Sequence, residues 1–269
     1  ADQISRPSVS YWKDAWRRFR RDKLAVFGLV MILIVSLFAI FGPMFCPYAY
    51  DEADFFSIAQ WPSKAHWFGT DALGRDLYVR VLYGARISLS IGVVAALVNM
   101  VIGVLYGGIA GYFGGKVDNV MMRIVDIIYS LPDMLMVVLL SVVLREVINV
   151  DAFPALQKIG TNMISMFIVF ALLYWTGMAR MVRGQILTVK QNEYILAARV
   201  SGANDSRIIR RHILPNIVSV IIIAAALQIP SAIFTESFLS FAGLGVQAPM
   251  PSLGSLANAA RGGMMSYPH

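Results

Sequence analysis

The sequence has few of the residues from which metal sites and catalytic clusters are built. It contains one cysteine, Cys46, so it can form neither an internal disulfide nor a multi-cysteine metal site. Its histidines, His66, His212 and His269, are too scattered for a metal cage. An intramembrane hydrolase would need a serine and a histidine to meet, and neither His66 nor His212 has a suitable sequence context. We therefore expect no metal site and no enzyme activity in this chain.

Charged residues are also scarce. They make up 14% of the 269 residues, whereas 58% are hydrophobic, and the mean hydropathy is +0.65. Soluble domains average about 25% charged residues. This composition predicts an integral membrane protein. The net charge of +7 then indicates basic loops on the inner side of a membrane, not nucleic-acid binding.

Apolar runs predict an all-α, polytopic helical bundle with five membrane spans. Each run reaches the roughly 20 residues that a bilayer requires. They lie at 24–46, 87–115, 120–144, 159–182 and 213–236. The third run contains Pro132 and the fifth contains Pro230, so we expect each of these helices to kink or break there.

The distribution of Lys and Arg predicts the orientation. Lys13, Arg17, Arg18, Arg20, Arg21 and Lys23 precede the first span. This places residues 1–23 in the cytoplasm, as an amphipathic N-terminal segment on the inner leaflet or a solvated basic flank. Alternation puts the loop 47–86 outside, where its glycines and mixed charges predict an ordered cap. It puts the segment 190–216 inside. The core of the bundle would then occupy 87–269.

Acidic residues within the spans are candidate functional residues, because they are costly in lipid. Asp133 and Glu236 are assigned to a substrate pathway. Glu236 has a competing interpretation, in which it pairs with an outer arginine. For Asp126, a salt bridge to a basic residue near the inner surface is favoured over substrate contact. Gly103, Gly107 and Gly111 stand four apart and predict a smooth, closely packed helix face.

The uncharged segment 237–260 is rich in Gly, Pro and Ser. Such a backbone cannot satisfy its hydrogen bonds in lipid, so it must be buried in protein or line a cavity. We expect it to form either an outer gate or a structural plug.

The stretch EYILAARVSGANDSRIIRRHILPN, residues 193–216, is charged and helix-forming. It predicts a short helix that ends at Gly202 and a second that begins near Asn204 and loses regularity at Pro215. A DNA-binding helix-turn-helix would need its own hydrophobic core, and the second helix leads directly into a span. A plain basic loop remains possible. We favour a docking element, because Ala197, Ala198, Gly202 and Ala203 permit close approach of a partner.

This segment resembles the cytoplasmic "EAA" loop of ABC importer permeases. That pattern is Glu-Ala-Ala, three residues, Gly, nine residues, Ile, one residue, Leu-Pro. Ala197, Ala198, Gly202, Leu214 and Pro215 fall at the matching places, whereas Leu196 stands at the usual Glu and His212 at the Ile. The stretches FGTDALGRDLYVRVLYGARISLS, AGYFGGKVDNVMMRIVD, MARMVRGQIL and ESFLSFAGLGVQAPMPSLGS also resemble the C-type permease of oligopeptide and dipeptide importers. The resemblance covers nearly the whole chain from Tyr11.

The resemblance implies a type I importer permease in a bacterial inner membrane. Its partners would be a second homologous permease, two ATP-binding subunits and an extracytoplasmic peptide-binding protein, with ATP and Mg on the partner subunits. It places Glu193, Tyr194, Ala197, Ala198, Gly202, Ala203, His212, Leu214 and Pro215 in contact with an ATP-binding subunit.

Two alternatives to peptide import remain at this point. One is an ABC permease for nickel or another small solute, because such permeases share much of the pattern. The other is an ion-coupled transporter or channel, although no internal repeat is apparent. The sequence has no Gly-rich phosphate loop before Lys-Ser or Lys-Thr, so ATP hydrolysis is expected in another chain. We also expect a sixth span after the C-terminus of this sequence.

Overall fold

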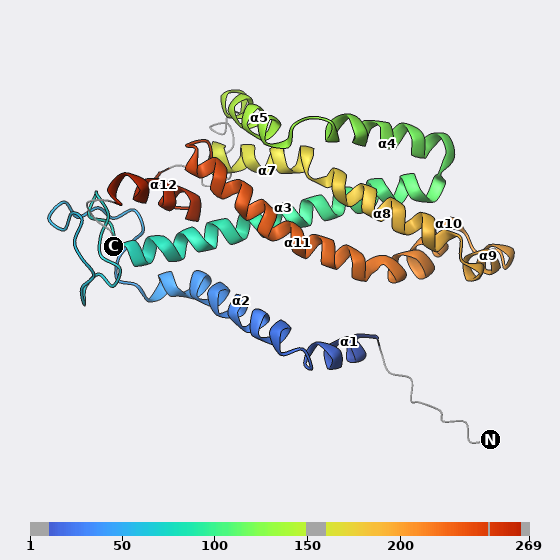
Figure 1. The fold of residues 1–269 in the computed structure, drawn as a ribbon, viewed down its shortest axis with the longest axis horizontal. Helices are drawn as coiled ribbons and strands as arrows, with labels where there is room; N and C mark the ends of the chain where they lie inside the picture. Colours follow the sequence, from blue (N-terminus) through green and yellow to red (C-terminus); the bar gives the residue numbers. More distant parts are fainter. Residues whose placement is uncertain (1–10, 149–159, 247, 265–269) are drawn as a thin grey trace, which may run out of the picture.

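The computed structural model describes residues 11–148, 160–246 and 248–264, and these ranges form helices joined by turns and loops (Figure 1). The helices are α1 (Tyr11–Phe19), α2 (Lys23–Phe41), α3 (Leu77–Phe113), α4 (Gly115–Tyr129), α5 (Asp133–Val147), α7 (Thr161–Leu173), α8 (Trp175–Lys190), α9 (Glu193–Val200), α10 (Asp205–Ile208), α11 (Leu214–Phe241) and α12 (Leu253–Gly263). The short helices α9 and α10 lie at one end of the bundle, here named the α9 end. The loop between α2 and α3 lies with α12 at the other, the α12 end (Figure 1).

Four helical stretches in the described ranges are long and apolar enough to cross a membrane. They are Lys23–Phe45, Leu77–Phe113, Thr161–Lys190 and Asp205–Phe241, and the bent pair α4 and α5 makes a fifth if it counts as one span. The all-helical prediction is confirmed, and the spans number the predicted five when the bent pair is counted as one. The helix predicted from residue 87 begins earlier, at Leu77, because Asp76 caps it by accepting a hydrogen bond from the Val79 backbone N–H at 2.9 Å. The expected sixth span lies outside the described residues.

The two prolines act differently. At Pro132 the chain turns by 84° between α4 and α5, which confirms the predicted break. At Pro230 the helix is not interrupted, because α11 continues from Leu214 to Phe241. Next to the proline, the Ser231 hydroxyl donates to the Leu227 carbonyl at 3.3 Å, and hydroxyls of this kind help a membrane helix to tolerate proline.

Close packing of α3 against α8 confirms the prediction from the glycine spacing. A Cβ atom on Gly107 would lie 2.2 Å from the carbonyl oxygen of Ala179. One on Gly103 would lie 2.5 Å from Cβ of Met178, and one on Gly111 would lie 3.0 Å from the carbonyl oxygen of Arg183. The two backbones therefore approach closely over three turns of α3.

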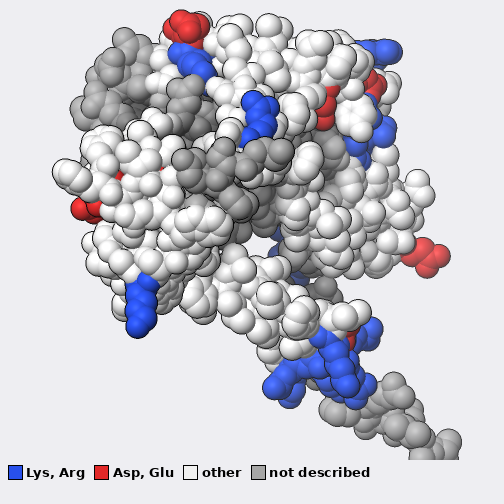
Figure 2. Space-filling model, turned by 60° about the vertical axis from the view of Figure 1, so that its left-hand side comes forward, with Lys and Arg blue, Asp and Glu red and all other residues white. Residues whose placement is uncertain are grey.

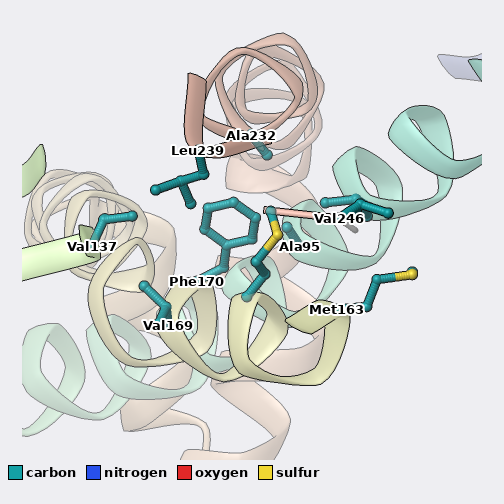
Figure 3. Packing of buried hydrophobic residues seen from close by; sticks show 10 residues of the cluster. Ala95, Val137, Met163, Val169, Phe170, Ala232, Leu239 and Val246 are labelled. Carbon is teal, nitrogen blue, oxygen red and sulfur yellow. The ribbon is translucent and has the colours of Figure 1, made fainter. Parts of the chain in front are cut away.

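Hydrophobic side chains from four helices form the core between these elements. Figure 3 shows the Phe170 ring of α7 among Val137, Ala95 and Leu239, which come from α5, α3 and α11. Phe170 is 1% exposed and Leu239 is fully buried. This cluster fixes α5 and α11 on either side of α7.

The α2 helix contacts the rest of the protein along one side only. It packs on α3, where the Arg86 side chain donates to the carbonyl oxygens of Ala39 and Ile40. Most of its apolar side chains are exposed, as expected for a helix that faces lipid. The preceding helix α1 confirms the helical part of the N-terminal prediction. Lys13 and Arg17 of α1 form a basic patch with Arg20 and Arg21, which directly follow the helix (Figure 2).

The loop between α2 and α3 is ordered, as its composition predicts. The Asp76 carboxylate contacts His66 Nδ1 at 2.8 Å, and Asp71 forms ion pairs with Arg75 and Arg80. His66 and Asp76 are both buried. These contacts hold the loop against the start of α3.

Candidate functional site

The two predicted short helices and the tight turn between them are present at the α9 end. α9 ends at Val200, and Gly202 follows with φ of +80°, a left-handed conformation that favours glycine. The Ala203 backbone N–H then donates to the Ala198 carbonyl at 3.0 Å, and the Asn204 side chain caps α10 by accepting from the Arg207 N–H. The chain thus reverses within a few residues.

The second helix differs from its predicted form in its ending. α10 passes into a wider π-helical turn, Ile209–Ile213, and this turn leads directly into α11. The irregularity therefore precedes Pro215. Pro215 lies in the first turn of α11, where a missing N–H breaks no intrahelical hydrogen bond.

Three isoleucines anchor residues 190–216 to the bundle. This segment is here named the coupling loop, after the role that the family resemblance implies for it. Ile195, Ile208 and Ile213 are each at most 1% exposed. They join a cluster that includes Val182 and Ile186 of α8. The apolar burial means that the coupling loop moves with α8 and α11, not independently.

A buried tyrosine at the end of α3 makes the polar contacts to the coupling loop. The Tyr112 hydroxyl donates to the Asp205 carboxylate at the start of α10, and it accepts from Arg199 of α9 at 3.5 Å. Lys190, at the end of α8, donates to the Tyr112 carbonyl. Tyr112 is 3% exposed. This set, named the Tyr112 node, fastens both short helices to α3.

The predicted contact residues divide between the surface and the interior. Those exposed are Glu193, Tyr194, Ala197, Gly202 and Pro215, and those half-buried are Ala198, Ala203, His212 and Leu214. The ring centroid of Tyr194 lies 6.4 Å from that of His212, so the first and last parts of the segment meet.

Sequence reasoning missed the most exposed apolar residues of α9. Leu196 is 66% exposed and Val200 is 86% exposed. Val200 lies four residues after Leu196 and three after Ala197, so these three exposed side chains lie on one side of α9, away from the buried Ile195. The spacing was visible in the sequence. Leu196 was assigned no role, because it was compared only with the usual Glu of the family pattern.

Two salt bridges join α4 to α8 near the α9 end. Arg183 forms a bidentate pair with Asp118, with both contacts at 2.6 Å, and Asp118 is buried. Arg180 pairs with Asp126 at 2.6 Å, which confirms the predicted salt bridge of Asp126. Together with the glycine face, these pairs tie α3, α4 and α8 into one unit.

Glu236 does not form the arginine pair that was weighed for it, within the residues that the structure describes. Its carboxylate is fully buried and accepts hydrogen bonds from Ser88 of α3 at 2.9 Å and from Ser240 at 2.6 Å. Ser252 joins the set through Ser240 at 3.2 Å. This set, named the Glu236 node, holds the start of α12 against α3 and α11.

The Glu236 node also shows how the Gly- and Pro-rich segment is buried. The Leu253 backbone N–H donates to Ser88, and a Cβ atom on Gly254 would lie 2.4 Å from the Ser237 carbonyl. Part of the segment is therefore buried against α3 and α11, as its polar backbone requires. Asp133 lies elsewhere, at a cavity between α5 and α11 that Glu236 does not line.

Comparisons with known proteins agree with this architecture. Residues 103–267 match the family described as "Binding-protein-dependent transport system inner membrane component". The chain belongs to this family. Residues 10–62 also match the family described as the N-terminal TM domain of oligopeptide transport permease C. It is therefore a multi-pass membrane permease subunit of the ABC transporter type, as the resemblance implied.

Relatives of known name extend the similarity over the whole chain. The dipeptide transport system permease protein DppC of Bacillus subtilis (strain 168) is 46% identical over 96% of this chain and 76% of the relative. The oligopeptide transport system permease protein OppC of the same organism is 45% identical over 100% and 83%. The OppC of Escherichia coli (strain K12) is 44% identical over 92% and 78%.

Proposed function

We propose that the chain is one permease subunit of an ATP-driven importer of oligopeptides or dipeptides. The names of the DppC and OppC relatives support peptides as the cargo. The coupling loop supports the power source, because it presents an apolar helix face outside the membrane spans. An exposed apolar face of this kind marks a protein contact.

The occupant of that face is an ATP-binding subunit in the cytoplasm. The face formed by Leu196, Ala197 and Val200 would enter a groove of that subunit. Glu193 and Tyr194 would flank the contact, while the half-buried Ala198, Ala203, His212 and Leu214 shape it from behind. The N-terminus is then cytoplasmic, and the α12 end faces outward. The basic patch of α1 fits this orientation, since Lys and Arg are concentrated on cytoplasmic sides.

The complete importer would contain further subunits. A second homologous permease would supply the other half of the pathway, two ATP-binding subunits would hold ATP and Mg, and an extracytoplasmic peptide-binding protein would deliver the cargo. ATP-driven closure of the ATP-binding subunits would move the coupling loop, and the Tyr112 node would pass this movement to α3. Transport by alternating access requires such a bias between two states.

Peptide uptake into proteoliposomes tests this function. The complex that copurifies with the chain is reconstituted, and uptake of a labelled tripeptide is measured with and without internal ATP. ATP-dependent uptake is expected. A Leu196→Asp, Val200→Asp double variant should lose both uptake and the ATP-binding subunit, because charges would replace the apolar face.

Leu73→Asp is the matched control for that variant. Leu73 is 44% exposed in the loop at the α12 end, so it undergoes the same chemical change far from the coupling loop. Its uptake should equal that of wild type. Uptake that persists in the absence of any ATP-binding subunit would contradict the proposal and favour an ion-coupled transporter.

A further inference from the structure

A cavity of about 620 Å³ opens beside the break between α4 and α5. Small-molecule sites in proteins enclose about 300–1,000 Å³. It is lined by Asp133 of α5, Tyr174 between α7 and α8, and Pro230, Ser231, Phe234 and Thr235 of α11. Pro230 and Thr235 lie well inside the apolar span Asp205–Phe241, so the cavity is at membrane depth.

Asp133 is the one charged side chain among the described residues that line this cavity. It is exposed, and no Lys or Arg of the described ranges forms an ion pair with it. It differs in this from Asp118 and Asp126, which both pair with arginines of α8. A carboxylate at membrane depth is costly without a cationic partner. The Asp133 carboxylate is therefore free to pair with a cation from outside the described chain.

The hydroxyl groups facing Asp133 are arranged to accept hydrogen bonds. Thr235 donates its hydroxyl proton to the Ser231 carbonyl at 3.0 Å. The Tyr174 hydroxyl, 3.3 Å from Thr235 Oγ1, can donate to Thr235 while Thr235 donates to Ser231. The lone pairs of the Tyr174 oxygen remain available. The cavity thus offers a carboxylate and a phenolic acceptor to a donor-rich cation.

An apolar groove continues from the cavity between α5 and α11. It has a volume of about 450 Å³, and Met134 lines both spaces. Its other lining residues are Leu135, Val138, Leu139, Val142 and Phe238. A ligand that enters both spaces needs a cationic head and an apolar continuation.

We propose that this cavity binds the N-terminal ammonium group of a peptide in transit. The ammonium would form an ion pair with Asp133 and donate to the Tyr174 oxygen, while the first side chains of the peptide occupy the groove beyond Met134. A divalent metal fits less well, since no group of three His, Cys, Asp or Glu in the described ranges could hold one. The inference rests on the proposed peptide cargo and adds to it a specific contact.

Uptake of labelled trialanine by the complete reconstituted complex tests this contact. Asp133→Asn keeps the size of the side chain and removes its charge. We expect it to raise the trialanine concentration for half-maximal uptake by about tenfold, because a charge-assisted hydrogen bond is lost. Asp133→Glu restores the carboxylate and should recover most of the affinity. Tyr174→Phe should produce a smaller increase in the same concentration.

Asp51→Asn is the matched control. Asp51 is an exposed acid in the loop between α2 and α3, and its substitution should leave uptake at the wild-type level. The inference is overturned if Asp133→Asn behaves like wild type, or if Asp133→Asn and Asp133→Glu are equally impaired. It is also overturned if Asp133→Asn loses the second permease subunit in a pull-down, because Asp133 would then be an interface residue.

Failure of the proposed function gives a different result. If the wild-type complex itself takes up no trialanine with ATP, peptide import is wrong, and this inference falls with it. If wild type is active and only the pattern among the Asp133 variants fails, peptide import stands and the ammonium contact alone is rejected.

Discussion

The two ends of α3 carry buried polar nodes of opposite construction. At the α12 end, the Ser88 hydroxyl donates a hydrogen bond to the fully buried Glu236. The side chains of the described residues that donate to Glu236 are all serine hydroxyls. At the α9 end, the Tyr112 node joins α3 to charged side chains, and two of these, Arg199 and Asp205, are exposed. Both nodes connect segments that are far apart in the sequence.

The difference indicates different tasks. Removing a member of the Glu236 node leaves buried groups without partners, which costs free energy, so this end is locked. The contacts of the Tyr112 node reach residues near the surface, where water can replace them at lower cost. Such a node can transmit a movement from the coupling loop without fixing one state. The α9 end thus suits coupling, and the α12 end suits closure.

A change in the close packing of α3 against α8, between the two nodes, should have the largest effect on the protein. Gly107→Leu would place side-chain atoms where the Ala179 backbone lies, so α3 and α8 would separate. We expect loss of folded protein in size-exclusion chromatography. Gly108→Leu is the control, because a Cβ atom there meets nothing within 4 Å. Equal behaviour of the two variants would contradict the close packing of α3 on α8.

Glu236→Ala should have the next largest effect, at the α12 end. It removes the acceptor shared by Ser88 and Ser240 and leaves a cavity, at a cost of about 3 kcal/mol in unfolding free energy. Thermal unfolding in detergent measures the loss, and transport should fall with it. Glu236→Gln should be milder, because it keeps one oxygen acceptor. A wild-type melting temperature for Glu236→Ala would contradict the claim that the Glu236 node locks the α12 end.

Tyr112→Phe should have a smaller effect on stability and a clear effect on coupling. It keeps the ring and removes the hydroxyl that contacts Asp205 and Arg199. We expect the peptide uptake per ATP hydrolysed to fall about tenfold, within the usual range of coupling energies. The neighbouring Phe113→Leu, at a side chain that is 61% exposed, is the control. An unchanged ratio in Tyr112→Phe would mean that the loop moves α3 by another route.

The two pairs between α4 and α8 should show the smallest effects. Arg180→Ala breaks a pair in which both side chains are partly exposed, and such pairs contribute about 1 kcal/mol or less. Arg183→Ala leaves Asp118 buried without its partner, so its melting temperature should fall further. Equal melting temperatures would indicate that solvent reaches both pairs alike.

Local patterns predicted the elements, because each depends on neighbouring residues. The apolar runs, the turn at Gly202, the break at Pro132 and the glycine face of α3 are all present. The interruption expected at Pro230 is absent, because α11 continues through it from Leu214 to Phe241. The early start of α3 at Leu77 was missed, although Asp76 is a common capping residue.

The nodes could not be predicted, because their members meet only in the folded chain. Tyr112 and Asp205 lie on different elements, as do Ser88 and Glu236, and no spacing in the sequence relates them. Asp126 could be assigned, because basic residues were expected at its membrane depth. For Glu236 an arginine partner was weighed beside a role in a substrate pathway, and the described residues give it serine hydroxyls instead of the arginine. Serine hydroxyls carry no charge, so no charge pattern in the sequence indicates them.

Cross-linking from α9 tests most directly whether the coupling loop binds an ATP-binding subunit. In a Cys46→Ala background, Val200→Cys places one thiol on the outward face of α9, and Leu73→Cys places one at the α12 end as the control. A short amine-reactive and thiol-reactive linker is applied to the complex in native membranes, and the products are identified by mass spectrometry. The account predicts a product between Val200→Cys and an ATP-binding subunit, and no such product from Leu73→Cys. A Val200→Cys product that lacks an ATP-binding subunit, and contains only other membrane proteins or a second copy of this chain, would contradict the account.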